Sequence, residues 1–251
     1  MDLRPLVLTG CCFLALAVTA CDRISYSLFS KEDEAPWTQN VLAAEIRLPG
    51  TDAPVVSRLS QLLSRAETVP GVKEAAIVDD LPGVRAALRK NQYGIGREGA
   101  PDSGVMACLV QGISPRYFAT MGIGLIQGRI FSPGDLESGV PVAIVNETYA
   151  KKNWPGESPI GRRLRLLSGW GNGPWSTVVG VVQDGPNTED MPEVYFPYRQ
   201  YALHGRGLQV FSWFLLARTA EDSKAVAAPL QQTVGQEFWS LAAWLKRRES
   251  K

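Results

Sequence analysis

Hydrophobic and polar positions divide residues 41 to 80 into a strand, a helix and a second strand. Residues 41 to 48 (VLAAEIRL) roughly alternate between apolar and polar, which predicts a strand ended by a proline–glycine turn. Between residues 56 and 66 the apolar side chains recur at spacings of three and four, so they share one face of a helix. Residues 72 to 78 (VKEAAIV) predict the second strand. We expect the helix of this unit to pack on a sheet.

The rest of the chain alternates short apolar runs with turns rich in glycine and proline, which predicts more strands than helices. Helices are expected at residues 117 to 121, 147 to 154 and 223 to 238. The pair Ser114-Pro115 offers a cap for the first helix, and Asn146 offers one for the second. Gly180 inside an apolar run predicts a bulge. Strands are expected at residues 105 to 113, 140 to 146, 161 to 167, 177 to 182, 193 to 198 and 208 to 217, with a short one or two around Tyr93.

Composition and charge place the chain among globular proteins and name no partner. It has 251 residues, of which 45% are hydrophobic and 20% are charged, enough apolar side chain for one sizeable core or two small ones. The 26 lysines and arginines almost balance the 25 aspartates and glutamates. So small a net charge creates no long-range field that would draw the chain onto a nucleic acid.

Cysteine and histidine are too scarce in the body of the chain for the usual metal sites. Three of the four cysteines, Cys11, Cys12 and Cys21, lie in an apolar stretch at the amino terminus, which leaves Cys108 alone in the body. One thiol cannot form an internal disulfide. Because His204 is the only histidine, zinc sites built from cysteine and histidine are out of reach as well. We expect no metal and no cofactor.

The amino terminus resembles the signal peptide of a bacterial lipoprotein. Residues 6 to 20 carry no charge, and this run of about 15 residues is shorter than the roughly 20 that a membrane-spanning helix needs. It ends in VTAC at residues 18 to 21, which looks like a lipobox, whose cysteine receives a diacylglyceryl group before cleavage. Residues 1 to 20 are then the signal peptide, and Cys21 is the lipidated first residue. An ordinary cleaved signal and an uncleaved anchor are the alternatives.

A polar tether is expected after the lipidated cysteine. Residues 21 to 40 contain the charge cluster KEDE and show little periodicity, so they require no packed structure. Asp22 resembles the residue that retains lipoproteins in the inner membrane of many enveloped bacteria. We therefore expect the chain at the periplasmic face of that membrane.

The carboxyl-terminal residues have a composition suited to the lipid headgroup region. Trp239 and Trp244 precede three consecutive cations, Lys246, Arg247 and Arg248. Tryptophan, lysine and arginine are enriched where proteins meet a membrane surface. These five side chains are candidate membrane contacts in or beside a basic tail at residues 241 to 251. A packed or frayed terminus is the alternative.

Several motifs that often carry chemistry have structural explanations here. The sequence GIGREG at residues 94 to 99 matches GxGxxG, but no helix is expected after it to receive a pyrophosphate. His204 is expected in a loop at residues 201 to 207, with no nucleophile or acid assigned to it. Asp79-Asp80 and Asp184 follow strands, where we expect them to form turns in preference to a cation site. No catalytic residue is assigned.

Four blocks of sequence occur in an order that is typical of one family. They are GISPRYFATMGIGLIQGRIFSPGD at 112 to 135, VAIVNETYAKKNWPGESPIGRRLRL at 142 to 166, WSTVVGVVQD at 175 to 184 and PEVYFPYRQ at 192 to 200. Together they resemble the MacB-like periplasmic core domain of ABC transporter permeases of the MacB/FtsX type, especially the long permeases common in acidobacteria. The resemblance covers about residues 41 to 235.

This resemblance implies an α+β fold for a core domain at residues 41 to 240. A porter-like subdomain of strand-helix-strand units would be interrupted by a smaller, mainly β subdomain at about residues 131 to 190. Full permeases of the family also carry several membrane helices and work with a nucleotide-binding subunit or domain. The sequence has no GxxxxGK[ST] loop and no later apolar run of membrane-spanning length. We therefore expect a stand-alone periplasmic domain.

The function implied by the resemblance is non-catalytic. Such a domain would dock an ABC transporter permease, its ATPase or another envelope protein and relay motion at the membrane, without a small-molecule substrate. Two alternatives stay open. In the first, the chain is a truncated relic of a permease gene. In the second, it is a periplasmic enzyme. The sequence offers no assignable nucleophile, base or metal set for an enzyme, although catalytic groups can converge in space from distant positions.

Overall fold

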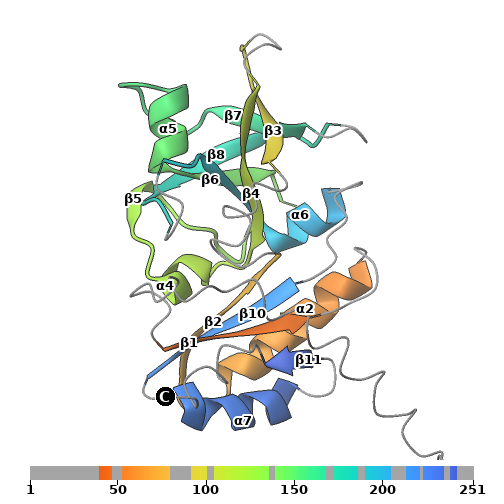
Figure 1. The fold of residues 1–251 in the computed structure, drawn as a ribbon. Coiled ribbons are helices and arrows are strands. Elements are labelled where there is room, and N and C mark those ends of the chain that lie inside the picture. The colour runs from red at the N-terminus through yellow and green to blue at the C-terminus, as the bar shows by residue number, and fades with distance from the viewer. Residues whose placement is uncertain are drawn as a thin grey trace, which may run out of the picture.

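Two interleaved strand–helix–strand units build one half of the computed structural model (Figure 1). The structure describes residues 40–46, 53–79, 92–100, 105–135, 139–167, 172–185, 190–204, 213–220, 223–234 and 238–241. The strands of the two units alternate in an antiparallel sheet of order β11-β1-β10-β2, the arrangement of a split βαβ fold. The units are β1 (Val41–Ile46), α2 (Ala53–Glu67) and β2 (Val72–Val78), and β10 (Trp213–Thr219), α7 (Ser223–Val234) and β11 (Phe238–Leu241).

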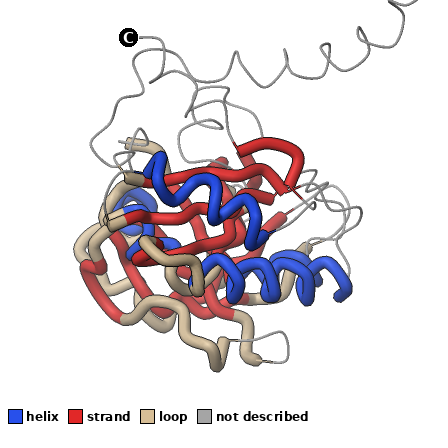
Figure 2. Tube along the Cα trace, turned by 90° about the horizontal axis from the view of Figure 1, so that it is seen from below, coloured by secondary structure: helices blue, strands red, loops and turns tan. Residues whose placement is uncertain are grey.

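Both faces of this sheet are covered, which explains the continuous apolar run at the end of β2. Ala75 and Ile77 belong to the core that α2 and α7 close, whereas Ala76 and Val78 belong to a second core on the opposite face. Successive side chains of a strand point to opposite faces, so a strand buried on both sides has no polar positions. Figure 2 shows α2 and α7 lying side by side across the strands.

A six-stranded β-barrel forms the other half and lies between β2 and β10 along the chain. Each strand pairs with two others of the ring, which closes in the order β3-β4-β9-β6-β8-β7 and returns to β3. The pairs β4–β9 and β6–β8 are parallel. The strands are β3 (Gln92–Arg97), β4 (Met106–Ile113), β6 (Val142–Asn146), β7 (Arg163–Leu167), β8 (Ser176–Val182) and β9 (Glu193–Pro197), and β5 (Leu125–Gly128) is added outside the ring against β8.

Three short helices accompany the barrel: α4 (Tyr117–Met121), α5 (Glu147–Asn153) and α6 (Tyr198–His204). The predicted cap of α5 is confirmed, because the Asn146 side chain accepts a hydrogen bond from the Tyr149 backbone N–H at 2.9 Å. The predicted cap of α4 is wrong. The Ser114 hydroxyl instead accepts a hydrogen bond from the Ile77 N–H at 2.9 Å, which ties α4 to β2.

Other boundaries also differ from the sequence prediction. The expected helix at residues 223 to 238 ends at Val234, and β11 follows and pairs with β1. The expected loop at 201 to 207 is wrong in its first part, because α6 continues to His204. The expected bulge at Gly180 is confirmed, since the pairing of β8 with β6 skips Val179. The α+β class is confirmed, and the barrel includes β3 and β4, which precede the range 131 to 190.

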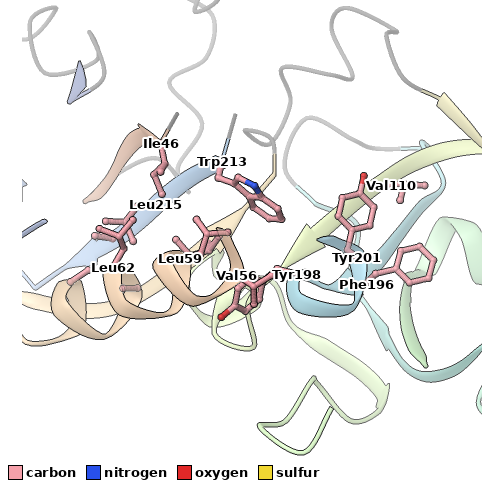
Figure 3. Close-up of a cluster of buried hydrophobic side chains, with 14 of the residues drawn as sticks. Ile46, Val56, Leu59, Leu62, Val110, Phe196, Tyr198, Tyr201, Trp213 and Leu215 are labelled. Atoms are coloured by element: carbon pink, nitrogen blue, oxygen red, sulfur yellow. The ribbon is translucent and has the colours of Figure 1, made fainter. Parts of the chain in front are cut away.

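Both cores contain side chains from the two halves. β2 pairs with β4 through Val78 and Ile113, which joins the sheet to the barrel. Figure 3 shows buried side chains of one core on both sides of the junction, and they belong to a single cluster. It runs from Ile46 and Leu215 in the sheet, past Leu59 of α2, Trp213 of β10 and Tyr198 of α6, to Tyr201, Phe196 and Val110 in the barrel half.

Candidate interaction surfaces

Most residues that the sequence singles out for membrane attachment lie outside the described part of the chain. These are Cys21, Trp244, Lys246, Arg247 and Arg248. Trp239 belongs to β11, the strand that pairs with β1. Within the described residues, every helix is too short or too polar to cross a bilayer. The lipidation of Cys21 and the membrane contacts of the tail stay predictions.

The GxGxxG sequence lies in a strand and not in a nucleotide-binding turn. Gly94 and Gly96 sit inside β3, opposite Leu167 and Arg165 of β7. Gly99 follows in a turn with φ of 76°. A dinucleotide fingerprint needs a turn that leads into the amino terminus of a helix. Here β3 is held between β4 and β7 instead.

The aspartates at strand ends accept hydrogen bonds that tie neighbouring elements together. Asp79 is buried and accepts from the Gly112 N–H at 2.9 Å. Asp184 accepts from the backbone and the hydroxyl of Thr148, at 3.0 and 2.7 Å. Asp80 lies outside the described residues. Among those described, no group of three or more histidine, cysteine, aspartate or glutamate side chains is placed to hold a metal ion.

Cys108, Tyr149 and Tyr195 are buried and are not activated for chemistry. Burial, with a smaller contribution from the charge of Glu193, raises the pKa of the Cys108 thiol far above its usual range. A protonated thiol is a poor nucleophile. Burial also raises the pKa values of Tyr149 and Tyr195, and the Tyr195 hydroxyl donates to Glu193 at 2.7 Å. These groups therefore stay protonated at neutral pH.

A cleft of about 190 Å³ lies between the two halves, with Ser60 and Leu63 of α2 on one wall and residues 131–135 and 197–199 on the other. The Ser60 and Tyr198 hydroxyls share a hydrogen bond of 2.8 Å, and Arg199 donates to Ser60 at 2.9 Å. Ligand pockets usually measure about 300–1,000 Å³. This cleft is smaller, and Ser60 on the α2 wall is already hydrogen-bonded to Tyr198 and Arg199 on the opposite wall.

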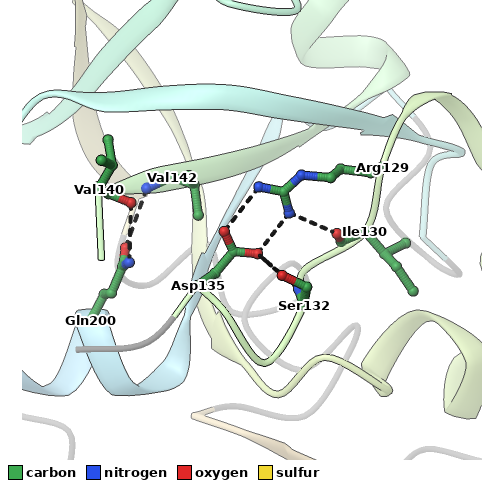
Figure 4. A network of polar contacts seen from close by, with 7 residues as sticks. All are labelled: Arg129, Ile130, Ser132, Asp135, Val140, Val142 and Gln200. Carbon is green, nitrogen blue, oxygen red and sulfur yellow. Dashed lines mark hydrogen bonds and ion pairs between the residues drawn. The ribbon is translucent and has the colours of Figure 1, made fainter. Parts of the chain in front are cut away.

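One wall of the cleft is fixed by an ion pair in the loop after β5 (Figure 4). Arg129 donates to both carboxylate oxygens of Asp135, at 2.6 and 2.9 Å. Ser132 donates to the same carboxylate through its N–H at 2.8 Å and its hydroxyl at 3.0 Å. Burial opposes the charge of Asp135, but the hydrogen bonds from Arg129 and Ser132 outweigh it and hold the pKa of the carboxyl below its ordinary value.

The same view shows how α6 is tied to the barrel. The Gln200 side-chain oxygen accepts from the Val142 N–H at 3.2 Å, and its nitrogen donates to the Val140 carbonyl at 3.4 Å. Gln200 thereby fixes the start of β6 against α6. The polar contacts of this region thus have structural roles.

β5 is an exposed edge strand. Among the described strands it pairs with β8 alone, and all four of its residues are exposed. Leu125 is 47% exposed, Ile126 is 52% exposed, and Ile130 just beyond the strand is 42% exposed. Unpaired edges with apolar side chains are surfaces on which other chains can add a strand.

The outer face of the barrel carries an arginine stacked on a tryptophan. The guanidinium carbon of Arg165 lies 4.5 Å from the centroid of the Trp175 ring, and that of Arg163 lies 5.8 Å from it. Arg163 also donates to Glu98 at 2.8 Å. Within the described residues Arg165 has no ion pair or hydrogen bond, and its Nε is buried without a partner. The alternation RLRLL in β7 predicts that both arginines face outward. It does not predict their contact with Trp175.

Comparison with known proteins bears on the whole fold. The family model of the MacB-like periplasmic core domain matches residues 36–233. The periplasmic region of MacB from Actinobacillus actinomycetemcomitans superposes with a TM-score of 0.55 at 15% identity, over 88% of this chain and 98% of that one. The extracellular domain of the noncanonic ABC-type transporter YknZ from Gram-positive bacteria gives 0.50 at 16% identity, over 84% and 96%. No curated protein sequence matches.

Proposed function

Because the chain belongs to the family of MacB-like periplasmic core domains, we propose that it is a non-catalytic coupling module of an ABC transporter permease system. Two solved domains of the same fold are the periplasmic region of MacB and the extracellular domain of the ABC-type transporter YknZ. The module docks a permease, its ATPase partner or another envelope protein and passes motion between them. Burial keeps Cys108, Tyr149 and Tyr195 protonated, so none of these three groups is poised as a nucleophile or base.

The observation that carries this proposal is the shared core of the two halves. Motion is relayed only if the halves cannot move independently, and close-packed interiors transmit strain. α4 fills the junction with an aromatic cluster. The Phe118 and Tyr195 rings lie 5.0 Å apart, and Tyr117 lies 5.5 and 6.0 Å from them. A push on the sheet therefore reaches the barrel through packed side chains.

Attachment to the membrane is the second part of the proposal. A lipid on Cys21 holds the domain at the periplasmic face of the inner membrane, and residues 21 to 40 act as the tether. Trp239 and Trp244, with Lys246, Arg247 and Arg248, contact the headgroups. Each cation near an anionic membrane surface adds about 1 kcal/mol of binding free energy.

Affinity capture from detergent-solubilised native membranes tests both parts. We expect the unchanged chain in the membrane fraction, together with permease or ATPase subunits identified by mass spectrometry. Cys21→Ser should release the chain into the soluble periplasmic fraction. A variant that combines Lys246→Gln, Arg247→Gln and Arg248→Gln should stay lipidated but bind anionic vesicles more weakly. An unmodified Cys21 thiol would contradict the lipid anchor. Capture from crosslinked native membranes that recovers no transporter subunit would contradict the coupling role.

A further inference from the structure

We propose that Arg165, stacked on Trp175, is the point at which the barrel recognises an acidic side chain of a partner protein. We call the surface formed by Val105, Ala107, Arg165, Leu167 and Trp175 the Arg165 face. The inference rests on the proposed docking function and names the contact through which docking occurs.

Strand register places Ala107, Leu167 and Arg165 on one outer face of the barrel, and side-chain contacts add Val105 and Trp175 to it. Gly94 of β3 lies between Ala107 of β4 and Leu167 of β7, and the next outward position of β3, Gly96, lies beside Arg165. Residues directly opposite each other, or two apart in one strand, share a face. The Arg165 face therefore spans β4, β3 and β7.

The two glycines of β3 lie beneath apolar side chains of the neighbouring strands. A Cβ atom on Gly94 would lie 2.8 Å from Val105, and one on Gly96 would lie 3.4 Å from Leu167. The side chains of Val105 and Leu167 thus lie over β3, which has no side chain of its own at these two positions. Val105 is 42% exposed. These side chains offer a partner apolar contacts beside the cation.

Arg165 differs from its neighbours in charge compensation. Arg163 is paired with Glu98, and Arg162 is paired with Glu157. Arg165 has no carboxylate among the described residues, and its charge is held against the Trp175 ring. Stacking fixes a guanidinium at low entropic cost, and the planar fork of arginine binds a carboxylate through two hydrogen bonds. The missing partner of this site is therefore a carboxylate.

One unpaired cation beside apolar side chains is typical of a protein–protein interface and not of a segment that binds a membrane. Segments that bind anionic membranes gather about four to eight lysines and arginines. Protein interfaces instead concentrate their binding energy in a few tryptophans and arginines surrounded by apolar contacts. We therefore identify the occupant as a protein segment that presents an aspartate or glutamate between apolar residues.

Site-specific photo-crosslinking of the full chain in native membranes tests this inference. With the crosslinker at position 107, we expect an adduct to one protein, mapped beside an aspartate or glutamate. Arg165→Gln should reduce the yield of this adduct roughly tenfold, because a charge-assisted hydrogen bond is lost. Arg165→Lys keeps the charge and should reduce the yield less. The matched control Arg162→Gln removes an exposed, paired arginine of the same barrel and should leave the yield unchanged.

The outcomes separate this inference from the proposed function. Equal yields with Arg165→Gln and Arg162→Gln, or adducts to lipid alone, would overturn the Arg165 face, while captured transporter subunits would still support coupling. Thermal unfolding of Arg165→Gln checks that the barrel is intact. In a charge exchange, Arg165→Glu is combined with a partner variant in which arginine replaces the mapped aspartate or glutamate. This combination should restore the adduct. Failure of that exchange would also count against direct pairing.

Discussion

Individual polar side chains hold the loops of the barrel half, and Asp135 is the clearest case. Its side chain is 9% exposed, whereas that of its partner Arg129 is 49% exposed. The pair is therefore only partly shielded from water, which weakens its contribution below that of a buried pair. Two further hydrogen bonds from Ser132 make the carboxylate the centre of the loop.

We predict that Asp135→Asn lowers the free energy of unfolding by about 1 kcal/mol at pH 7. The pKa of Asp135 is lowered in the folded state from an ordinary value of 3.8. Its charge thus stabilises the fold above that pH, and the contribution is lost as the pH falls through the folded-state pKa. Urea unfolding at pH 7 and at progressively lower pH measures the free energies of unfolding of the wild type and the variant. The difference between them should shrink toward zero as the pH falls. A difference that persists unchanged in acid would contradict this account.

At the scale of the elements, the start of α5 is held by one buried side chain. Asn146 accepts from the Tyr149 and Glu193 N–H groups, each at 2.9 Å, and donates to the Met191 carbonyl at 2.7 Å. It therefore caps the helix and also joins β6 to the start of β9. A cap on an exposed helix contributes about 1 kcal/mol. This one also satisfies backbone groups that are buried.

Asn146→Ala should accordingly lower the free energy of unfolding by about 2–4 kcal/mol, because it leaves buried donors without an acceptor. Asn146→Asp keeps the acceptor oxygens but loses the donor to Met191, so its loss should be smaller. Chemical denaturation followed by far-UV circular dichroism measures both. Lys151→Ala on the exposed side of α5 is the control and should leave the midpoint nearly unchanged. Equal effects of Asn146→Ala and Lys151→Ala would remove the capping argument.

Elements with a strong local pattern are the ones that the sequence predicts well. α2 and β2 have clear periodicity and appear where expected. β11 was not expected, because residues 238–241 continue an apolar run after α7 and only pairing with β1 makes them a strand. α6 was missed for a related reason. Its tyrosines, Tyr198 and Tyr201, are buried by packing between the halves, which no local signal reveals.

Closure of the barrel and the Arg165 face also depend on contacts between distant residues. Alternation in β7 shows which residues face outward, but the ring closes through pairings such as β3 with β7, about seventy residues apart in the sequence. The predicted attachment residues were found from composition, which says nothing of tertiary contacts. Arg165 cannot be singled out from the sequence, because its distinction is the lack of a carboxylate partner among the described residues, which depends on tertiary contacts.

The two halves together should unfold as one unit, because the core crosses their junction. Two-state unfolding is expected when no part can open without exposing the core of another. Phe118 lies in this junction and is 2% exposed, with Tyr195 of the barrel against its ring. It belongs to the cluster that also contains Val78 and Leu216 of the sheet. Removing it weakens the contact that both halves share.

We predict that Phe118→Ala lowers the free energy of unfolding by about 3–5 kcal/mol and shifts the transitions of both halves together. Hydrogen exchange read by mass spectrometry in increasing urea follows β10 in the sheet and β8 in the barrel separately. In the wild-type protein the slowest amides of both strands should exchange at the same denaturant concentration. Leu59→Ala changes α2 in the sheet half. If the domain is one cooperative body, this variant should lower the denaturant concentration at which β10 and β8 exchange by the same amount. If the barrel instead remained protected after the sheet had opened, the halves would be independent, and a domain built that way would absorb motion instead of relaying it.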